Sequence, residues 1–164
     1  MPIQLLISDA NIFIDMGVAE LLDQMFALPY EYMTPESLFE EELRGSYGDL
    51  VSKGLRLEVL TPEIIERVQI LSEKYNGVSN HDLNVVALAE DKQTPLLTGD
   101  RKLRQVCMEE DVDVRGTLWL MEQLFSSELI TVERAALAYE RMADDGSRLP
   151  WDDVGKQIKK FKKQ

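Results

Sequence analysis

The sequence contains a single cysteine, Cys107, and a single histidine, His81, among its 164 residues. One cysteine excludes an internal disulfide framework. The absence of HExxH, CxxC and any Cys/His cluster argues against a zinc site with nitrogen and sulfur ligands. With one histidine and no GxSxG motif, a Ser-His-Asp triad is not expected. Cys107 follows Leu103 and Val106 at helical spacing, so we expect it in the core rather than as a nucleophile.

Glycine-rich phosphate-binding motifs are also missing. Neither GxGxxG nor GxxxxGK followed by Ser or Thr occurs, which excludes the simplest nucleotide-binding sites. No apolar run approaches the ~18 residues of a membrane span. The first ten residues have no positively charged segment and include Asp9, so no signal peptide is expected and a cytoplasmic location is predicted.

Basic residues are few and unevenly placed. The chain has 18 Lys and Arg against 30 Asp and Glu, and its formal charge is −12. Five lysines lie in the last nine residues, and the rest of the chain has 13 basic against 30 acidic residues, a formal charge of −17. Such a body does not attract nucleic acid through its overall field. Binding of nucleic acid would require a divalent cation, a local basic patch or a partner.

Short apolar runs alternate with helical patterns along most of the chain, which predicts an α/β fold with a parallel sheet covered by helices. Strands are expected at 3–8, 30–34, 55–60, 94–98 and 112–114. Helices are expected at 20–28, from 35, and at 62–74, 80–90, 102–109, 117–125 and 131–142. Thr34-Pro35 and Thr61-Pro62 are both typical helix starts, with Thr as the N-cap. The segment 45–54 is expected to be a loop.

The length suits one domain, which we place at residues 1–145. The segment 146–164 contains Trp151, Phe161 and the five lysines, and we interpret it as a basic tail rather than a second domain. We expect this tail to be frayed and solubilising, although contact with RNA or a partner is an alternative.

Carboxylates are the chemical groups that remain. Asp9 ends the first expected strand, Asp100 ends the strand TPLLTG, Asp82 opens the helix before that strand, and Glu41 lies on the helix after the second strand. Sites in open α/β sheets form at the carboxyl ends of strands. Four carboxylates that converged there would require a cation, and oxygen ligands favour Mg²⁺ or Mn²⁺.

Each acid also has a purely structural interpretation. Asp9 could cap or turn the chain into the next segment, Asp100 could be the N-cap of the helix at 102–109, and Asp82 would be favourable near a helix N-terminus. Glu41 lies in a run of three glutamates that could form a solvated surface. Spacing alone does not choose between ligand and structural roles.

Four stretches that carry these acids together resemble the PIN-domain family, and within it the small stand-alone proteins that include VapC-like toxins. They are, in the family's order, ISDANIFIDM, TPESLFEEEL, SNHDLNVVALAE and LLTGDRKLRQV, and VRGTLWLMEQL resembles the later part of the subgroup. The resemblance covers roughly residues 3–145. It implies a three-layer α/β/α sandwich with a central, mostly parallel sheet.

The resemblance implies that Asp9, Asp82 and Asp100 are metal ligands and catalytic residues, together with one glutamate. The spacing from Pro35 favours Glu41, and Glu42 is the alternative. Supporting roles are also expected for Thr98, through its hydroxyl, and for Asn11, as a polar contact near Asp9. Lys102 and Leu103 occupy the region in which many PIN proteins have a further acid, so the resemblance leaves one or two ions open.

The activity that the resemblance implies is cleavage of RNA phosphodiester bonds by a divalent-metal-dependent endoribonuclease. Arg101, Lys102 and Arg104 could contact phosphates or form an ordinary exposed helix face. His81 is expected at the surface rather than as a ligand. Family analogy adds a possible toxin role with an antitoxin partner, and self-association into a homodimer is a further expectation.

Two other functions stay open. A catalytically silent PIN-like module would bind RNA or protein, and the acidic body favours it. A phosphatase of the haloacid dehalogenase type would need a second Asp two residues after Asp9, where the chain has Asn11.

Overall fold

The computed structural model describes residues 3–164, so the first two residues of the predicted domain lie outside it. Its centre is a five-stranded sheet in the order β3-β2-β1-β4-β5, and every adjacent pair is parallel. The strands are β1 (Gln4–Ser8), β2 (Tyr30–Pro35), β3 (Arg56–Glu58), β4 (Leu96–Leu97) and β5 (Val114–Arg115). The predicted α/β/α fold with a parallel sheet is confirmed.

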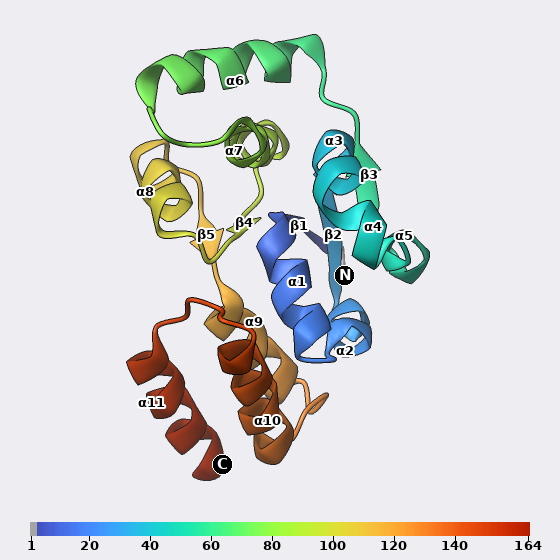
Figure 1. Cartoon of the computed structure of the whole chain (residues 1–164), viewed down its shortest axis with the longest axis vertical. Helices are drawn as coiled ribbons and strands as arrows, with labels where there is room; N and C mark the ends of the chain where they lie inside the picture. Colours follow the sequence, from blue (N-terminus) through green and yellow to red (C-terminus); the bar gives the residue numbers. More distant parts are fainter. Residues whose placement is uncertain (1–2) are drawn as a thin grey trace.

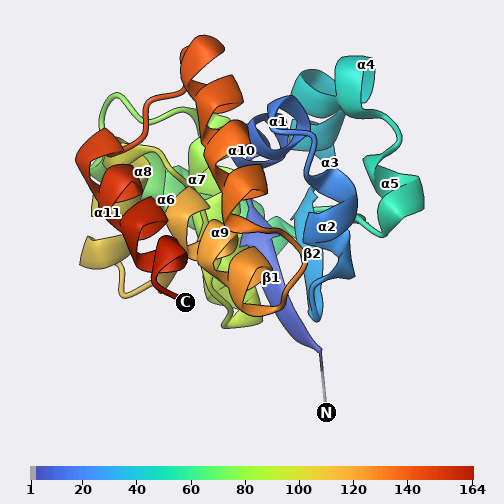
Figure 2. The same ribbon diagram turned by 90° about the horizontal axis from the view of Figure 1, so that it is seen from below.

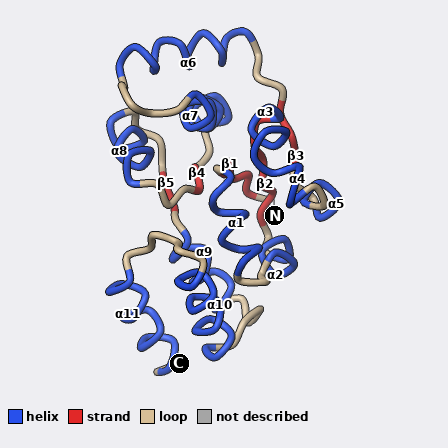
Figure 3. The backbone as a smooth tube through the Cα atoms, viewed as in Figure 1, coloured by secondary structure: helices blue, strands red, loops and turns tan. Residues whose placement is uncertain are grey.

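Helices cover both faces of this sheet (Figure 1). On one face α7 (Asn80–Lys92) packs on β1, β2 and β4, with α6 (Pro62–Lys74) and α8 (Arg101–Glu109) beside it. The other face carries α1 (Ala10–Val18) and α2 (Leu22–Ala27). Figure 3 shows the short strands, in red, lying among the helices, in blue.

Three further helices form a group that packs against α1 and α2. They are α9 (Thr117–Ser126), α10 (Val132–Asp144) and α11 (Trp151–Lys162). Figure 2 shows them grouped together, and contacts of α10 with α1 and of α9 with α2 join the group to the sheet layer. No helix within residues 3–164 has the length and apolar character needed to cross a membrane.

The core lies on both sides of the central strands. Leu6 and Ile7 of β1 and Leu96 and Leu97 of β4 are completely buried. A central parallel strand is covered on both faces, which is why these strands read as continuous apolar runs rather than as an alternating pattern.

The C-terminal segment is part of this packing. Val154 and Phe161 of α11 are buried, and the Phe161 ring stacks on Phe125 with 4.0 Å between the centroids. The amide of Gln157 donates to the carbonyl of Leu118 at 2.8 Å. The expectation of a frayed tail is therefore wrong, because apolar residues at helical spacing fix α11 against α9 and α10.

Two local expectations were also wrong. Thr34 does not cap a helix, because its hydroxyl donates to the Ser8 carbonyl at 3.0 Å and Pro35 still belongs to β2. The expected loop at 45–54 contains two short helices, α4 (Arg44–Tyr47) and α5 (Leu50–Lys53). They are preceded by α3 (Glu36–Leu38) and the π-helix η1 (Phe39–Leu43), which carries the three glutamates.

Candidate metal centre and nucleic-acid interface

The candidate site lies where the strand order reverses. β1 pairs with β2 on one side and with β4 on the other, and the chain leaves β1 at Asp9 and β4 at Thr98. The backbone N–H of Asp9 donates to the Leu97 carbonyl at 3.1 Å, which joins the two strand ends. Ligand sites of open α/β sheets form at such a reversal.

Asp9 is the buried acid of this site, with 4% of its surface exposed. Its Oδ1 accepts a hydrogen bond from the backbone N–H of Ile12 at 3.1 Å, so it caps α1. Its Oδ2 accepts a hydrogen bond from the Thr98 hydroxyl. The Thr98 oxygen in turn accepts from the backbone N–H of Asp100 at 3.1 Å. Thr98 thus links the first and last of the predicted acids.

The surroundings of Asp9 make its ionisation costly. Burial raises the pKa of Asp9 from 3.8 to about 7, although the hydrogen bonds from Thr98 and Ile12 oppose the rise. The charges of Asp82 and Asp100 raise the pKa further. Asp9, Asp82 and Asp100 are therefore close enough to interact electrostatically.

Asp82 and Asp100 approach Asp9 from two helix starts. Asp82 lies in the first turn of α7, which Ser79 caps, and burial together with the charge of Asp100 raises the pKa of Asp82. Asp100 is exposed and caps α8, where its Oδ1 accepts from the backbone N–H of Leu103 at 2.9 Å. Asp9 and Asp100 thus cap helices and also lie near one another.

Glu41, on η1, contacts the start of α7 through His81, and its charge is not among those that raise the pKa of Asp9 or Asp82. Its Oε2 lies 2.5 Å from Nε2 of His81, the residue that precedes Asp82. Of the neighbouring glutamates, Glu40 pairs with Arg44, the first residue of α4, and Glu42 is exposed. The structure therefore brings Glu41, rather than Glu42, to the start of α7. Sequence reasoning missed the contact with His81, for which adjacency to Asp82 was the available signal.

The donor chemistry of the site suits a hard divalent cation, because carboxylates and the Thr98 hydroxyl offer only oxygen. None of the ion pairs among residues 3–164 involves Asp9, Asp82 or Asp100. The charge of His81 partly opposes the rise in the pKa of Asp82. In that same range, however, no three His, Cys, Asp or Glu side chains already form a metal-binding group. An ion would need side-chain adjustment, or water molecules to complete its shell.

The expected phosphate contacts are exposed residues on α8. Arg101, Lys102 and Arg104 all face solvent along this helix. The Arg104 guanidinium lies close to Gly116, since a Cβ placed on that glycine would be 3.3 Å from Nη1. Asn11 is exposed in the first turn of α1, and no side-chain bond joins it to Asp9 in the described chain.

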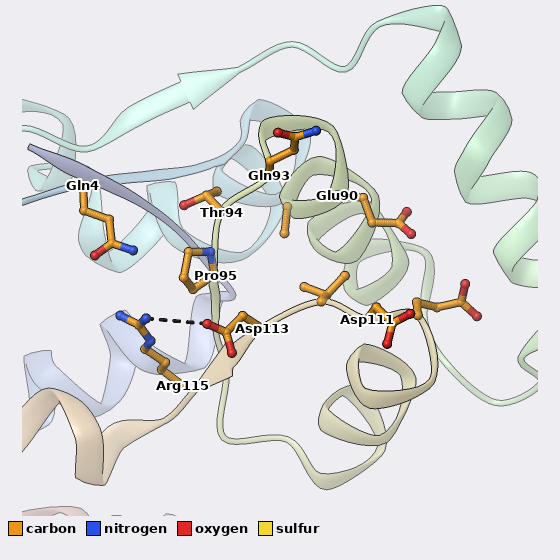
Figure 4. Close-up of a pocket in the computed structure, with 11 residues that line it drawn as sticks. Gln4, Glu90, Gln93, Thr94, Pro95, Asp111, Asp113 and Arg115 are labelled. Carbon is orange, nitrogen blue, oxygen red and sulfur yellow. Dashed lines mark ion pairs between the residues drawn. The ribbon is translucent and has the colours of Figure 1, made fainter. Parts of the chain in front are cut away.

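A separate pocket of about 560 Å³ opens at the opposite, amino-terminal edge of the sheet (Figure 4). Its lining includes Gln4, Thr94 and Pro95, which precede or begin strands β1 and β4. Asp113 and Arg115 also line this pocket, and 3.6 Å separates Oδ2 of Asp113 from Nη2 of Arg115. None of the predicted acids lines this pocket, and sequence reasoning did not predict it.

A family model described as "PIN domain" matches residues 5–163. A solved structure of a PilT N-terminus domain protein from the hyperthermophilic archaeon Sulfolobus solfataricus is similar over 76% of this chain and 93% of that chain, with 10% sequence identity and a TM-score of 0.49. No curated protein sequence matches the chain. Since the family model spans nearly all of the sequence, this chain belongs to the PIN-domain family.

Proposed function

We propose that this protein is a metal-dependent endoribonuclease that hydrolyses RNA phosphodiester bonds. PIN domains are generally nucleases. The observation that carries the proposal is the buried carboxylate of Asp9, which has two further acids near it and no basic partner in the described chain. Such an arrangement is unfavourable without a cation.

In this proposal Asp9, Asp82, Asp100 and Glu41 hold one or two Mg²⁺ or Mn²⁺ ions. A divalent ion in such a site activates water and stabilises charge at phosphorus during in-line displacement. The Thr98 hydroxyl keeps Oδ2 of Asp9 in place through its hydrogen bond. Asp9 and Asp100 each accept a hydrogen bond from a helix amide through Oδ1, and Oδ2 of Asp9 accepts from the Thr98 hydroxyl as well. Carboxylate oxygens have further lone pairs, so both acids could still bind an ion.

No protein nucleophile is part of this proposal. Cys107 is completely buried, and burial raises the pKa of its thiol to about 12, so the reactive thiolate is suppressed. Arg101, Lys102 and Arg104 are exposed on the helix that Asp100 caps. They are proposed to contact RNA phosphates, which would offset locally the repulsion by the acidic body.

The test is cleavage of a panel of end-labelled RNAs with Mg²⁺, with Mn²⁺ and with chelator. The wild-type protein, Asp9→Asn and an exposed control, Glu140→Gln, are purified identically. We expect the wild type and the control to cut only with metal, and Asp9→Asn to lose at least a hundredfold in rate. Equal cutting by wild type and Asp9→Asn would contradict the assigned site.

A catalytically silent module that binds RNA or protein is the second candidate. Two observations favour it: the formal charge of −17 outside the last nine residues, and the absence of a three-ligand group within residues 3–164. Folded protein that binds RNA, yet cuts none of the panel after removal of any inhibitor, would establish this alternative.

A toxin role with an antitoxin is the finer proposal, and it depends on family analogy alone. A protein inhibitor would cover the acidic site, with an Arg or Lys reaching its carboxylates. Co-expression with the product of a neighbouring gene, followed by an assay of growth arrest, tests this proposal. Growth that is unaffected by the protein alone would contradict it.

A further inference from the structure

The single histidine of the chain connects two elements that supply candidate ligands. His81 lies in the first turn of α7 and is followed by Asp82. Its side chain is 21% exposed, whereas that of Glu41 on η1 is 70% exposed. The Nε2–Oε2 distance of 2.5 Å therefore joins a largely buried imidazole to an exposed carboxylate.

Hydrogen-bond chemistry determines which ring nitrogen carries the proton. An ionised carboxylate can only accept, so Nε2 of His81 must donate to Glu41. In the neutral ring Nδ1 is then an acceptor, and it is buried without a partner in the described chain. The contact with Glu41 is thus the one side-chain hydrogen bond that orients this ring among residues 3–164.

The local backbone separates the three glutamates. A π-helical turn alters the side-chain directions of a helix and is frequent at functional sites, and η1 spans Phe39–Leu43. Glu40 makes two hydrogen bonds of 2.5 Å to the Arg44 guanidinium. Glu41 contacts His81, and Glu42 has no side-chain partner in the described chain.

We propose that His81 is a positioning residue that holds Glu41 at the start of α7, which carries Asp82. It thereby selects Glu41 from three consecutive glutamates as the ligand on η1. The part of this proposal that concerns metal binding rests on the proposed function, whereas the hydrogen bond itself does not. Partners of this kind that orient metal ligands typically affect metal affinity 10–100-fold.

The hydrogen bond is tested first by ¹⁵N NMR of the metal-free protein, at a pH above which the ring signals no longer change. One histidine gives one pair of ring signals. We expect the chemical shifts of the Nε2–H tautomer in the wild type, a shift of both signals in Glu41→Gln, and no shift in Glu42→Gln. Signals unchanged in Glu41→Gln, or changed equally in Glu42→Gln, would overturn the proposal.

The positioning role is tested by Mn²⁺ titration followed by EPR of the free ion. His81→Ala is expected to weaken binding about tenfold, and His81→Gln, whose amide can donate to Glu41, to restore part of it. In a Glu41→Gln background, His81→Ala should cause no further loss. Unchanged or tighter binding by His81→Ala would overturn the role of His81, whereas absence of Mn²⁺ binding by the wild type would overturn the proposed function itself. Glu140→Gln serves as the surface control.

Discussion

Replacement of Asp9 by Asn is expected to make the metal-free protein more stable. Burial and two neighbouring acids raise the pKa of Asp9 from 3.8 to about 7 in the folded state. Each pKa unit corresponds to about 1.4 kcal/mol, so ionised Asp9 reduces the free energy of unfolding by about 4 kcal/mol at alkaline pH. Asparagine carries no charge and does not incur this cost.

The substitution also removes a favourable contact. Asparagine caps helices as well as aspartate does, so the hydrogen bond from the Ile12 amide is retained. The Thr98 hydroxyl loses its carboxylate acceptor, which costs about 1–2 kcal/mol. The net expectation is a free energy of unfolding about 2–3 kcal/mol above wild type at about pH 8.

The sign of the pH dependence follows from the raised pKa. The folded state binds the Asp9 proton more tightly than the unfolded state, so this contribution is complete below about pH 4 and is lost as the pH rises through about 7. The advantage of Asp9→Asn should therefore vanish in acid. Added Mg²⁺ or Mn²⁺ should stabilise the wild type, by mass action, and leave Asp9→Asn unchanged.

The assay is urea unfolding in chelator at several pH values, with Glu140→Gln as the exposed control. Unchanged m-values would show that the difference lies in stability rather than in the compactness of a state. A variant less stable than wild type at about pH 8, or a difference that does not change with pH, would refute the reasoning from burial and repulsion.

Three other predictions concern different parts of the molecule. Hydrogen bonds from Lys74 and Tyr75 lower the pKa of Glu110. Ionised Glu110 should therefore add about 1–2 kcal/mol to the free energy of unfolding at neutral pH, measured against Glu110→Gln, and this difference should disappear as the pH falls through the lowered pKa. A difference that stays constant with pH would contradict the prediction. Phe161→Ala should cost about 3 kcal/mol in urea unfolding, because Phe161 is 2% exposed and stacks in the core, whereas no loss would show that α11 does not contribute to folding. Arg104→Gln should weaken RNA binding and reduce the slope of log K against log salt by about 1; an unchanged slope would remove Arg104 from the phosphate contacts.

Capping patterns in the sequence predicted helices correctly where the capping side chain binds the helix that directly follows it. Thr61 caps α6 as the Thr-Pro pattern predicted, and α7 begins at the predicted residue 80. The same Thr-Pro signal failed at Thr34, whose hydroxyl is used by the Ser8 carbonyl of the neighbouring strand. Helix α1 was not predicted, since ANIFIDMGV continues the apolar run with only Asp9 as a boundary. A tertiary contact decided the case of Thr34, and such a contact is invisible in a short window of sequence. The start of α1 is local, because the Asp9 side chain caps it.

Whether the acids meet also depends on tertiary contacts between distant parts of the chain. Asp9 and Thr98 are 89 residues apart, and they meet because β4 pairs beside β1 rather than at the sheet edge. From spacing, a capping role and a ligand role were alternatives for Asp9 and Asp100, but a carboxylate has two oxygens. One oxygen of each accepts from a helix amide, and this anchoring directs the other without using it for the cap. A cap at the end of a central strand is therefore a suitable support for a ligand, and the structural interpretation of these residues strengthens the functional one.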